Sequence, residues 1–382
     1  MIYCDYAATT PMSEQALTMY QTVARKYYGN ASSLHDIGSK AQDILEQARN
    51  ILARSLGVDA SRLFFTSGGT ESNILAIDTI LRSAPPHEKK HIITSTVEHS
   101  SIYYYLKQMD RSEMIDVTFL ACPNNGSIDM NELARSIQSN TCLVSIQHVN
   151  SETGIQQPIE EIGKLLRTRN IAFHSDFVQS FGKIKIDLRQ LPVDAISISS
   201  HKIYGPKGVG AVYFHPNIFL KPHPISTNHE KGIRPGTVDV ASIAAFVTAV
   251  EEMNHHLDQH FYYLKNIQHT FIDQIRHNKT GLTPIFVGES MHCPSIVGCI
   301  SDHTQGDYLM LEYNRFEIAI STGSACGLGQ SGIPRSIQPF IQDEEEGRRF
   351  IRFSFSHLTT EEDLEMIIRV SKQIGGEKFV EV

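Results

Sequence analysis

The chain has 382 residues, enough for two domains, because single hydrophobic cores usually stop growing near about 250 to 300 residues. Hydrophobic residues make up 41% of the sequence and charged residues 20%, as in ordinary globular proteins, and a net charge of −8 without a basic tract argues against a nucleic-acid-binding protein. No apolar run approaches about 18 residues and no signal-like segment opens the chain, so we expect a cytoplasmic protein without a membrane segment.

Helical and strand patterns alternate over the first two thirds of the chain. Apolar residues at helical spacing predict helices at 13–24, 39–56 and 241–253. Short apolar runs bounded by turn residues predict strands at 62–66, 91–95, 117–121, 141–146, 171–175, 195–199 and 211–214. This alternation is typical of a doubly wound α/β sheet whose strands are mostly parallel.

The strand at 62–66 leads into a glycine-rich turn, Ser67-Gly-Gly-Thr70, and then into a helix. The first N–H groups of a helix have no intrahelical partner, and the helix dipole favours an anion beside them. Gly69 and Thr70 are therefore candidate phosphate ligands. A plain turn is the alternative.

Polar side chains follow five of the predicted strands. Ligands of doubly wound sheets bind outside the carboxyl ends of the strands, so these side chains are expected to converge. Taken singly, each has a plain interpretation, such as a helix cap or a turn former; together they favour one shared ligand. The five sets are Gly69 with Thr70, Glu98 with His99, Asn150, Asp176 with Gln179, and His201 with Lys202.

Lys202 is the candidate nucleophile. Its sequence neighbours Ser199, Ser200 and His201 include no carboxylate that would hold the amine as an ion-paired ammonium, and an uncharged lysine amine can form a Schiff base. Asp176 ends the preceding strand. A carboxylate for a pyridinium nitrogen and an amine for an aldehyde are what pyridoxal phosphate requires, whereas a solvated surface lysine is the alternative.

The last third predicts a smaller α+β domain. Helical patterns cover 257–277 and 360–374, and short strands are predicted near 295–300, 318–320 and 350–355. We therefore expect a large cofactor-binding domain over 15–256. The small domain is expected to combine 1–14 with 257–382.

Cys326 lies in a glycine-rich segment, 321–334, which is unlike the setting of a packing cysteine. Cys122, Cys142 and Cys299 lie in apolar contexts and are expected to be buried. Arg352 alternates with apolar residues in the last strand and is a candidate to bind a substrate carboxylate; a surface arginine is the alternative.

No metal site is expected. His256 and His260 are four residues apart, a spacing that can place two ligands on one helix face. No acidic ligand or base accompanies them as in His-Glu-x-x-His, so a solvated helix is the preferred interpretation.

Several motifs lie in order over nearly the whole chain: Asp5-Tyr-Ala-Ala-Thr-Thr-Pro11, Thr66-Ser-Gly-Gly-Thr-Glu-Ser-Asn73, Val97-Glu-His99, His174-Ser-Asp-Phe-Val-Gln-Ser180, Ser199-Ser-His-Lys-Ile-Tyr-Gly-Pro-Lys-Gly208 and Ser321-Thr-Gly-Ser-Ala-Cys326. Together they resemble the cysteine desulfurases, in particular the nitrogenase-associated and iron-sulfur-cluster-assembly group. The resemblance implies the fold-type I architecture of pyridoxal-phosphate-dependent transferases, a homodimer with its active site at the dimer interface, and a long, mobile cysteine loop.

The resemblance also implies residue roles. Lys202 would attach pyridoxal phosphate, Asp176 would pair with its ring nitrogen, and His99 would stack on the ring and move protons. Asn150 and Arg352 would bind the substrate carboxylate, and Cys326 would be the sulfur nucleophile. The remaining cofactor ligands would be Gly69, Thr70, Ser199 and His201 at the phosphate, Thr237 from the other subunit, and Gln179 with Asn150 near the ring oxygen.

The implied reaction converts L-cysteine to L-alanine and leaves a persulfide on Cys326 for a protein acceptor. That acceptor would be a scaffold protein or a cluster-containing enzyme. The resemblance suggests an enzyme of NAD biosynthesis as one such acceptor. The alternatives are another pyridoxal-phosphate lyase or transaminase, such as a selenocysteine lyase, or a non-catalytic regulator. The segment Phe353-Ser-Phe-Ser-His357 departs from the usual Ser-Leu-Gly-Arg, so the resemblance does not fix the local shape near Arg352.

Overall fold

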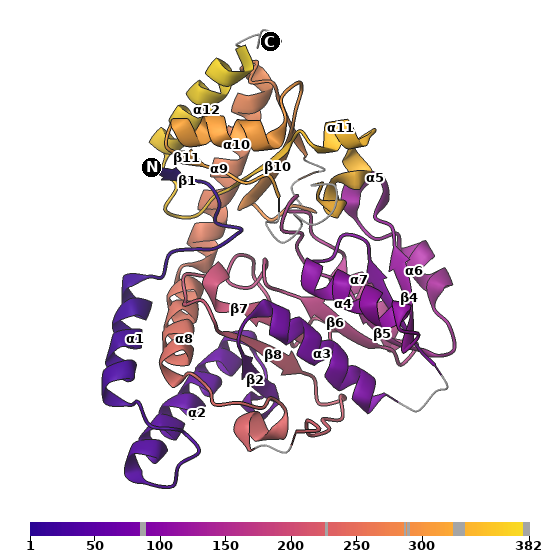
Figure 1. The fold of residues 1–382 in the computed structure, drawn as a ribbon, viewed down its shortest axis with the longest axis vertical. Helices are drawn as coiled ribbons and strands as arrows, with labels where there is room; N and C mark the ends of the chain where they lie inside the picture. Colours follow the sequence, from indigo (N-terminus) through magenta and orange to yellow (C-terminus); the bar gives the residue numbers. More distant parts are fainter. Residues whose placement is uncertain (85–88, 226–227, 286–287, 289–290, 324–332, 377–382) are drawn as a thin grey trace.

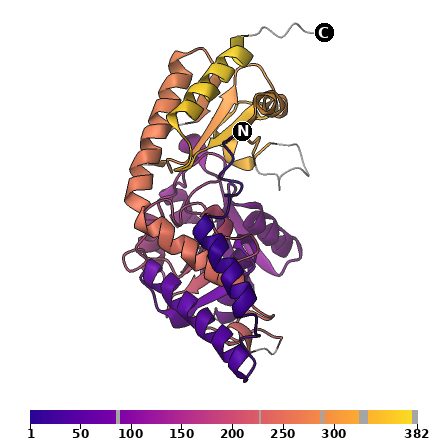
Figure 2. The ribbon, with the colours of Figure 1, turned by 90° about the vertical axis from the view of Figure 1, so that its left-hand side faces the viewer.

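The computed structural model describes residues 1–84, 89–225, 228–285, 288, 291–323 and 333–376. A sheet flanked by helices forms the lower part of the molecule in Figure 1, and the C-terminal elements form the upper part. The long helix α9 (Leu257–His277) runs between the two parts, as the turned view in Figure 2 also shows.

Seven strands of the described chain form the large sheet, in the order β2-β8-β7-β6-β5-β3-β4. The pairs from β7 through β4 are parallel, and β8 pairs antiparallel with both of its neighbours. The strands are β2 (Leu63–Thr66), β3 (Lys90–Ser95), β4 (Ile115–Leu120), β5 (Thr141–Ser145), β6 (Ala172–Asp176), β7 (Ala195–Ser199) and β8 (Gly210–Phe214).

Helices cover both faces of this sheet because its buried strands are apolar on both faces. On β3, Ile93 packs with residues of α2 (Asp36–Leu56), α7 (Ile159–Arg167) and α8 (Val240–His255). The adjacent Ile92 packs in a separate cluster with residues of α3 and α4. The other described helices of this part are α1 (Glu14–Lys26), α3 (Gly69–Ser83), α4 (Ser100–Arg111), α5 (Pro123–Gly126) and α6 (Met130–Ser136).

The upper part has its own core, in which Cys4 packs with side chains from residues 264–374. Its strands form the sheet β12-β10-β9 and the parallel pair β1-β11. The N-terminal strand thus lies beside C-terminal elements (Figure 1), whereas the domain boundaries near 15 and 256 remain a prediction. The elements are β1 (Ile2–Tyr3), β9 (Leu282–Ile285), β10 (Ile296–Ser301), β11 (Ile318–Ala319), β12 (Phe350–Ser354), α10 (Gly306–Arg315), α11 (Glu344–Gly347) and α12 (Glu361–Gly376).

The predicted α/β architecture is confirmed, and each helix and strand expected from the sequence is present, most of them with shifted ends. The sequence pattern did not reveal the antiparallel direction of β8, because alternation of apolar residues carries no strand direction. It also missed β9, which contains Pro284; this is compatible with its place at the edge of its sheet.

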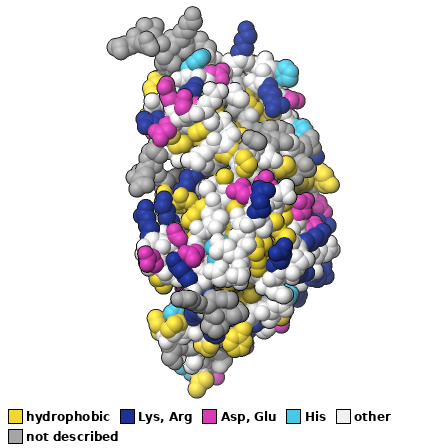
Figure 3. All heavy atoms as spheres, turned by 90° about the vertical axis from the view of Figure 1, so that its right-hand side faces the viewer, with side chains coloured by type: hydrophobic (Ala, Val, Ile, Leu, Met, Phe, Trp, Pro, Cys, Tyr) yellow, Lys and Arg dark blue, Asp and Glu magenta, His cyan; other side chains and the backbone are white. Residues whose placement is uncertain are grey.

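On the face shown in Figure 3, acidic and basic side chains are interspersed among polar and apolar ones. Within the part of the chain that the structure describes, no helix combines the length and apolar character needed to span a membrane.

We predict that the stability of this fold already decreases at pH values above those at which most carboxylates titrate. Burial lowers the pKa of His174 to about 3 and those of His148, His292 and His357 to about 4, whereas an unfolded chain protonates histidine near pH 6.5. The unfolded state therefore binds more protons between these values, and stability falls as the pH decreases from about 6.5 to 5. Burial raises the pKa of Glu98 to about 8, so in this pH range the folded state binds one proton more at Glu98, which offsets only part of the effect of the histidines.

The measurement is the urea midpoint of unfolding at pH 7, 6 and 5. A steady decrease is expected, and a constant midpoint over this range would contradict the assignment of these histidines as neutral in the folded state.

Candidate active site

Four candidate residues lie at one edge of the large sheet, where parallel strands end. Asp176 is the last residue of β6, and Lys202 ends a 3₁₀ turn, Ser200–Lys202, that follows β7 directly. His99 is the N-cap of α4 after β3, and Asn150 follows β5. The shared edge explains why residues far apart in sequence come together.

The amine of Lys202 is half-buried and faces the N-terminal segment. Its Nζ donates hydrogen bonds to the carbonyl oxygens of Ala7 and Ala8, both at 2.7 Å. Burial, together with the neighbouring cations of Lys183 and Arg352, lowers the pKa of Lys202 to about 7, against the opposing effect of two carboxylates. A large fraction of this amine is therefore uncharged at neutral pH, as a nucleophile requires.

Residues 4–10, here called the N-terminal strap, fix the turn that carries Lys202. The N–H and the hydroxyl of Thr10 both donate to the carbonyl oxygen of His201, at 2.9 and 3.0 Å. The N–H of Tyr204 donates to Oγ1 of Thr10 at 2.7 Å. Nδ1 of His201 lies 3.1 Å from Oγ1 of Thr9, and burial lowers the pKa of His201 to about 4, so this imidazole is neutral.

Asp176 is buried, and both of its carboxylate oxygens accept hydrogen bonds. Nδ2 of Asn73 donates to Oδ2 at 2.8 Å, and the N–H of Val178 donates to Oδ1 at 2.8 Å. Two N–H donors aimed at one carboxylate suit its ionised form, which is the form that would pair with a protonated ring nitrogen.

Asn73 also connects Asp176 to His99 through Ser101. Nδ2 of Asn73 donates to the Ser101 hydroxyl at 3.0 Å, and that hydroxyl lies 2.8 Å from Nδ1 of His99. The N–H of Ser101 donates to the same Nδ1 at 3.2 Å. Because Nδ1 accepts, the neutral ring carries its proton on Nε2. The sequence analysis missed Asn73 and Ser101, since no local pattern reveals a contact across 28 residues.

Asn150 and Gln179 are both buried and both hydrogen-bonded. Oδ1 of Asn150 accepts from the N–H groups of Glu152 and Thr153, both at 2.9 Å, and its Nδ2 donates to the carbonyl oxygen of Val97. Asn150 therefore stabilises a turn and also lies at the sheet edge that carries the candidate site. Nε2 of Gln179 donates to the carbonyl oxygen of Ala7 at 2.9 Å.

The start of α3 and the end of β7 fit a phosphate group. Gly68, the N-cap of α3, has φ of +144°, a conformation that favours glycine. A Cβ added to Gly69 would lie 2.8 Å from a methyl carbon of Val178 and 3.6 Å from Cβ of Ser199. The buried hydroxyls of Ser199 and Ser200 find no partner among the described residues. The Ser199 hydroxyl lies close to the start of α3, where unpaired helix N–H groups and an unpaired hydroxyl are donors suited to an anion, and Thr70 lies exposed at the same helix start.

Arg352 is buried, so the surface interpretation left open by its sequence pattern is wrong. Its Nη2 donates to Oδ1 of Asp5 at 2.6 Å, and its Nη1 donates to the carbonyl oxygen of Ser151 at 2.9 Å. Its Nε has no partner among the described residues. An unpaired buried N–H on a guanidinium is a donor suited to a substrate carboxylate.

A cavity of about 500 Å³ opens beside His99 and is also lined by Asp5, Ser321, Gly323 and Ile333. Gly323 and Ile333 flank residues 324–332, so both described ends of the segment that carries Cys326 border this cavity. Cys326 itself lies outside the described residues.

The remaining sequence candidates lie away from this edge. Thr237 is exposed in the single chain, and its role in a second subunit's site remains a prediction. Cys122 and Cys299 are buried as expected, but Cys142 is only partly buried because β5 presents it at the far, amino-terminal end of the sheet. On the helix expected to be solvated, His256 is exposed and His260 is half-buried, and the ring of His260 stacks on that of His357 with ring centroids 4.1 Å apart.

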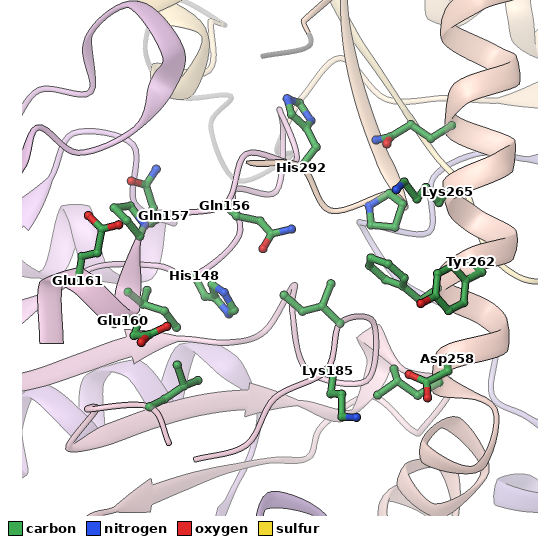
Figure 4. A pocket seen from close by; sticks show the side chains of 18 residues that line it. His148, Gln156, Gln157, Glu160, Glu161, Lys185, Asp258, Tyr262, Lys265 and His292 are labelled. Carbon is green, nitrogen blue, oxygen red and sulfur yellow. The ribbon is translucent and has the colours of Figure 1, made fainter. Parts of the chain in front are cut away.

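A larger cavity, of about 830 Å³, lies between α9 and the chain that follows β5. Figure 4 shows His148 and Gln156 on one side of it, Tyr262 of α9 on the other, and Lys185 below. Lys202 does not line it, so this cavity is separate from the candidate site.

The class-V aminotransferase family matches residues 2–367. A putative cysteine desulfurase NifS from Bacillus subtilis is 46% identical over 379 residues, which cover 99% of this chain and 95% of the relative.

Solved structures of similar proteins match this chain over nearly its whole length. A NifS-like protein superposes with a TM-score of 0.89 at 27% identity, covering 98% of both chains. A structure described as SspA in complex with cysteine has a TM-score of 0.78 at 30% identity, covering 94% of this chain and 100% of that one.

We predict that Ser199→Ala weakens the binding of pyridoxal phosphate without destabilising the protein. The Ser199 hydroxyl has no partner in the described chain, so its loss removes no internal bond. A hydrogen bond to a charged group is worth about 1.5 to 3 kcal/mol, so the dissociation constant should rise about tenfold or more. Fluorescence titration of the apoprotein measures this constant.

Ser197→Ala, two residues earlier on β7, is the matched control. The Ser197 hydroxyl bonds Nε2 of His174 at 2.9 Å, so this variant should lose stability and keep its cofactor affinity. The reverse pattern, a normal dissociation constant in Ser199→Ala, would show that Ser199 is not a phosphate ligand.

Proposed function

The chain belongs to the class-V aminotransferase family of pyridoxal phosphate enzymes and, within it, to the cysteine desulfurases, and we propose that it forms its persulfide on Cys326. The reaction converts L-cysteine to L-alanine and transfers the sulfur to that thiol. One observation carries the choice of Cys326: the residues on both sides of its segment border the cavity beside His99.

Bound pyridoxal phosphate supplies an electron-withdrawing ring that stabilises negative charge on the Cα of an amino acid. Lys202 is the residue that would attach it, and Asp176 the one that would keep its ring nitrogen protonated. The unpaired hydroxyl of Ser199 and the N–H groups of Gly69 and Thr70 would bind its phosphate, with His201 beside them.

The chain's own residues have separate tasks in this proposal. Arg352 and Asn150 bind the substrate carboxylate and fix the orientation of the Cα–H bond. Lys202, assisted by His99, moves the Cα proton, because its lowered pKa leaves the amine uncharged near neutral pH.

The thiolate of Cys326 then attacks the sulfur of the substrate. The carbon–sulfur bond breaks, a sulfur–sulfur bond forms, and the carbon skeleton takes up a proton. Cysteine and a thiol give alanine and a persulfide, so the atoms and electrons balance without an external oxidant.

Thr237 is proposed to complete the phosphate site of a second subunit, which makes the active protein a homodimer. Its exposure in the single chain is compatible with this task. The persulfide would pass to a protein acceptor in iron-sulfur cluster or thio-cofactor assembly, and the cytoplasm is the proposed location. A cluster-containing enzyme, for example in NAD biosynthesis, is one such acceptor.

A lyase or transaminase on the same fold, including a selenocysteine lyase, is the second candidate, and a non-catalytic regulator is the third. The relative at 46% identity and the structure described with cysteine favour the desulfurase. A lyase would complete its chemistry on the cofactor and would not need a thiol in the loop.

We predict that Cys326→Ser abolishes alanine release from L-cysteine, by at least about a hundredfold, while cofactor binding and stability stay normal. Serine keeps the size of the side chain but is a far weaker nucleophile toward sulfur. Chromatography measures alanine, and mass spectrometry measures the added sulfur atom on the protein.

Cys142→Ser is the matched control, because Cys142 is only partly buried and lies at the opposite end of the sheet from the candidate site. It should release alanine at the wild-type rate. Wild-type alanine release by Cys326→Ser would mean that another nucleophile or another reaction is at work.

A further inference from the structure

A second lysine, Lys183, is connected to Lys202 through one amide and one carbonyl. Nζ of Lys183 donates to Oε1 of Gln179 at 2.7 Å, and Nε2 of Gln179 donates to the carbonyl oxygen of Ala7 at 2.9 Å. The same Ala7 oxygen accepts from Nζ of Lys202 at 2.7 Å. Nothing in the sequence around Lys183 indicates this connection.

The chain reaches this arrangement through a tight turn at Gly182. Its φ is +71°, and a Cβ there would lie 2.8 Å from the Cγ2 methyl of Ile203. Ile203 follows Lys202 directly, so the turn that carries Lys183 packs against the turn that carries Lys202. A residue other than glycine would strain the backbone and separate the two turns.

The charges around Lys202 are two cations and two carboxylates. Lys183 and Arg352 oppose protonation of Lys202, and Asp5 and Asp176 favour it. Both carboxylates are already engaged by other donors, since Asp5 pairs with the Arg352 guanidinium and Asp176 accepts two N–H bonds.

Among the described residues, Lys183 pairs with no carboxylate, whereas Arg352, the other cation near Lys202, pairs with Asp5. Burial lowers the pKa of Lys183 to about 8, an effect that the nearby Cys293 opposes, and after burial the charge of Lys183 is the largest cause of the lowered pKa of Lys202. His201, adjacent to Lys202, is neutral and does not alter this balance.

We infer that Lys183 is a positioning residue whose ammonium group keeps the Lys202 amine uncharged and fixes the orientation of the Gln179 amide. Because Lys183 donates to Oε1, the Nε2 side of that amide must face Ala7 and Lys202. Gln179 therefore presents a donor on the cofactor side, which fits the ring oxygen that the sequence resemblance assigns to it. The inference rests on the proposed role of Lys202 as the cofactor lysine.

The test measures the basicity of Lys202 directly. The full-length apoprotein is labelled with trace acetic anhydride between pH 5 and 10, and mass spectrometry of the Lys202 peptide gives the pH at half-maximal labelling. The wild-type midpoint should lie near 7. Lys183→Met removes the charge and should raise that midpoint by about one pH unit or more, and Lys183→Arg, which keeps the charge, should leave it near the wild-type value.

Lys185→Met is the matched control. Lys185 lies two residues further along the chain, is exposed, and lines the separate cavity of Figure 4, so its loss should not change the midpoint. Circular dichroism and thermal unfolding establish that each variant is folded, and Lys183→Gln replaces Lys183→Met if the latter is not.

An unchanged midpoint in the folded Lys183 variant would overturn the inference, as would an equal rise in Lys185→Met. Because the labelling requires neither substrate nor turnover, its outcome is independent of whether alanine and a persulfide are formed. A failure of the desulfurase assignment is therefore distinguishable from a failure of the role given to Lys183.

Discussion

The N-terminal strap is the contact on which the geometry of the site depends. Its residues bond at one end to β12, where Asp5 pairs with Arg352 and the N–H of Ala7 donates to the Ser354 hydroxyl at 2.9 Å. At the other end, the carbonyl oxygens of Ala7 and Ala8 accept from Lys202. The group that would bind the substrate carboxylate and the amine that would move its proton are therefore held by one short run of backbone. The bond between Ala7 and Ser354 is buried, and a buried polar group that loses its partner costs about 1 to 3 kcal/mol, so the strap resists displacement.

A division of charge follows from this arrangement. The strap brings backbone carbonyls to Lys202, and Asp5, its carboxylate, is occupied by Arg352, so Lys202 is solvated by dipoles instead of being paired with an anion. Burial and the neighbouring cations of Lys183 and Arg352 then favour the neutral amine. The surroundings of Asp176 differ, because Asn73 and Val178 direct N–H donors at its carboxylate and so favour the charged form. An uncharged amine and an ionised acid at the same sheet edge are the pair that pyridoxal phosphate chemistry uses.

Sequence reasoning located the sheet and its site edge because strand ends are readable from local patterns, and the residues after parallel strands must meet. His99, Asp176 and Lys202 were found in this way. It could not find Asn73 or Lys183, whose tasks are defined only by partners in other elements. Nor could it settle whether Arg352 was buried, because its strand gains that burial from an N-terminal segment more than 340 residues away in the chain.

Borohydride reduction of the holoenzyme, followed by mapping of the labelled peptide, distinguishes Lys202 from Lys183 as the reactive amine. Pyridoxyl label is expected on Lys202 alone, and Lys202→Ala is expected to lose the covalent label while remaining folded. Label on Lys183 in the wild-type protein would contradict this assignment.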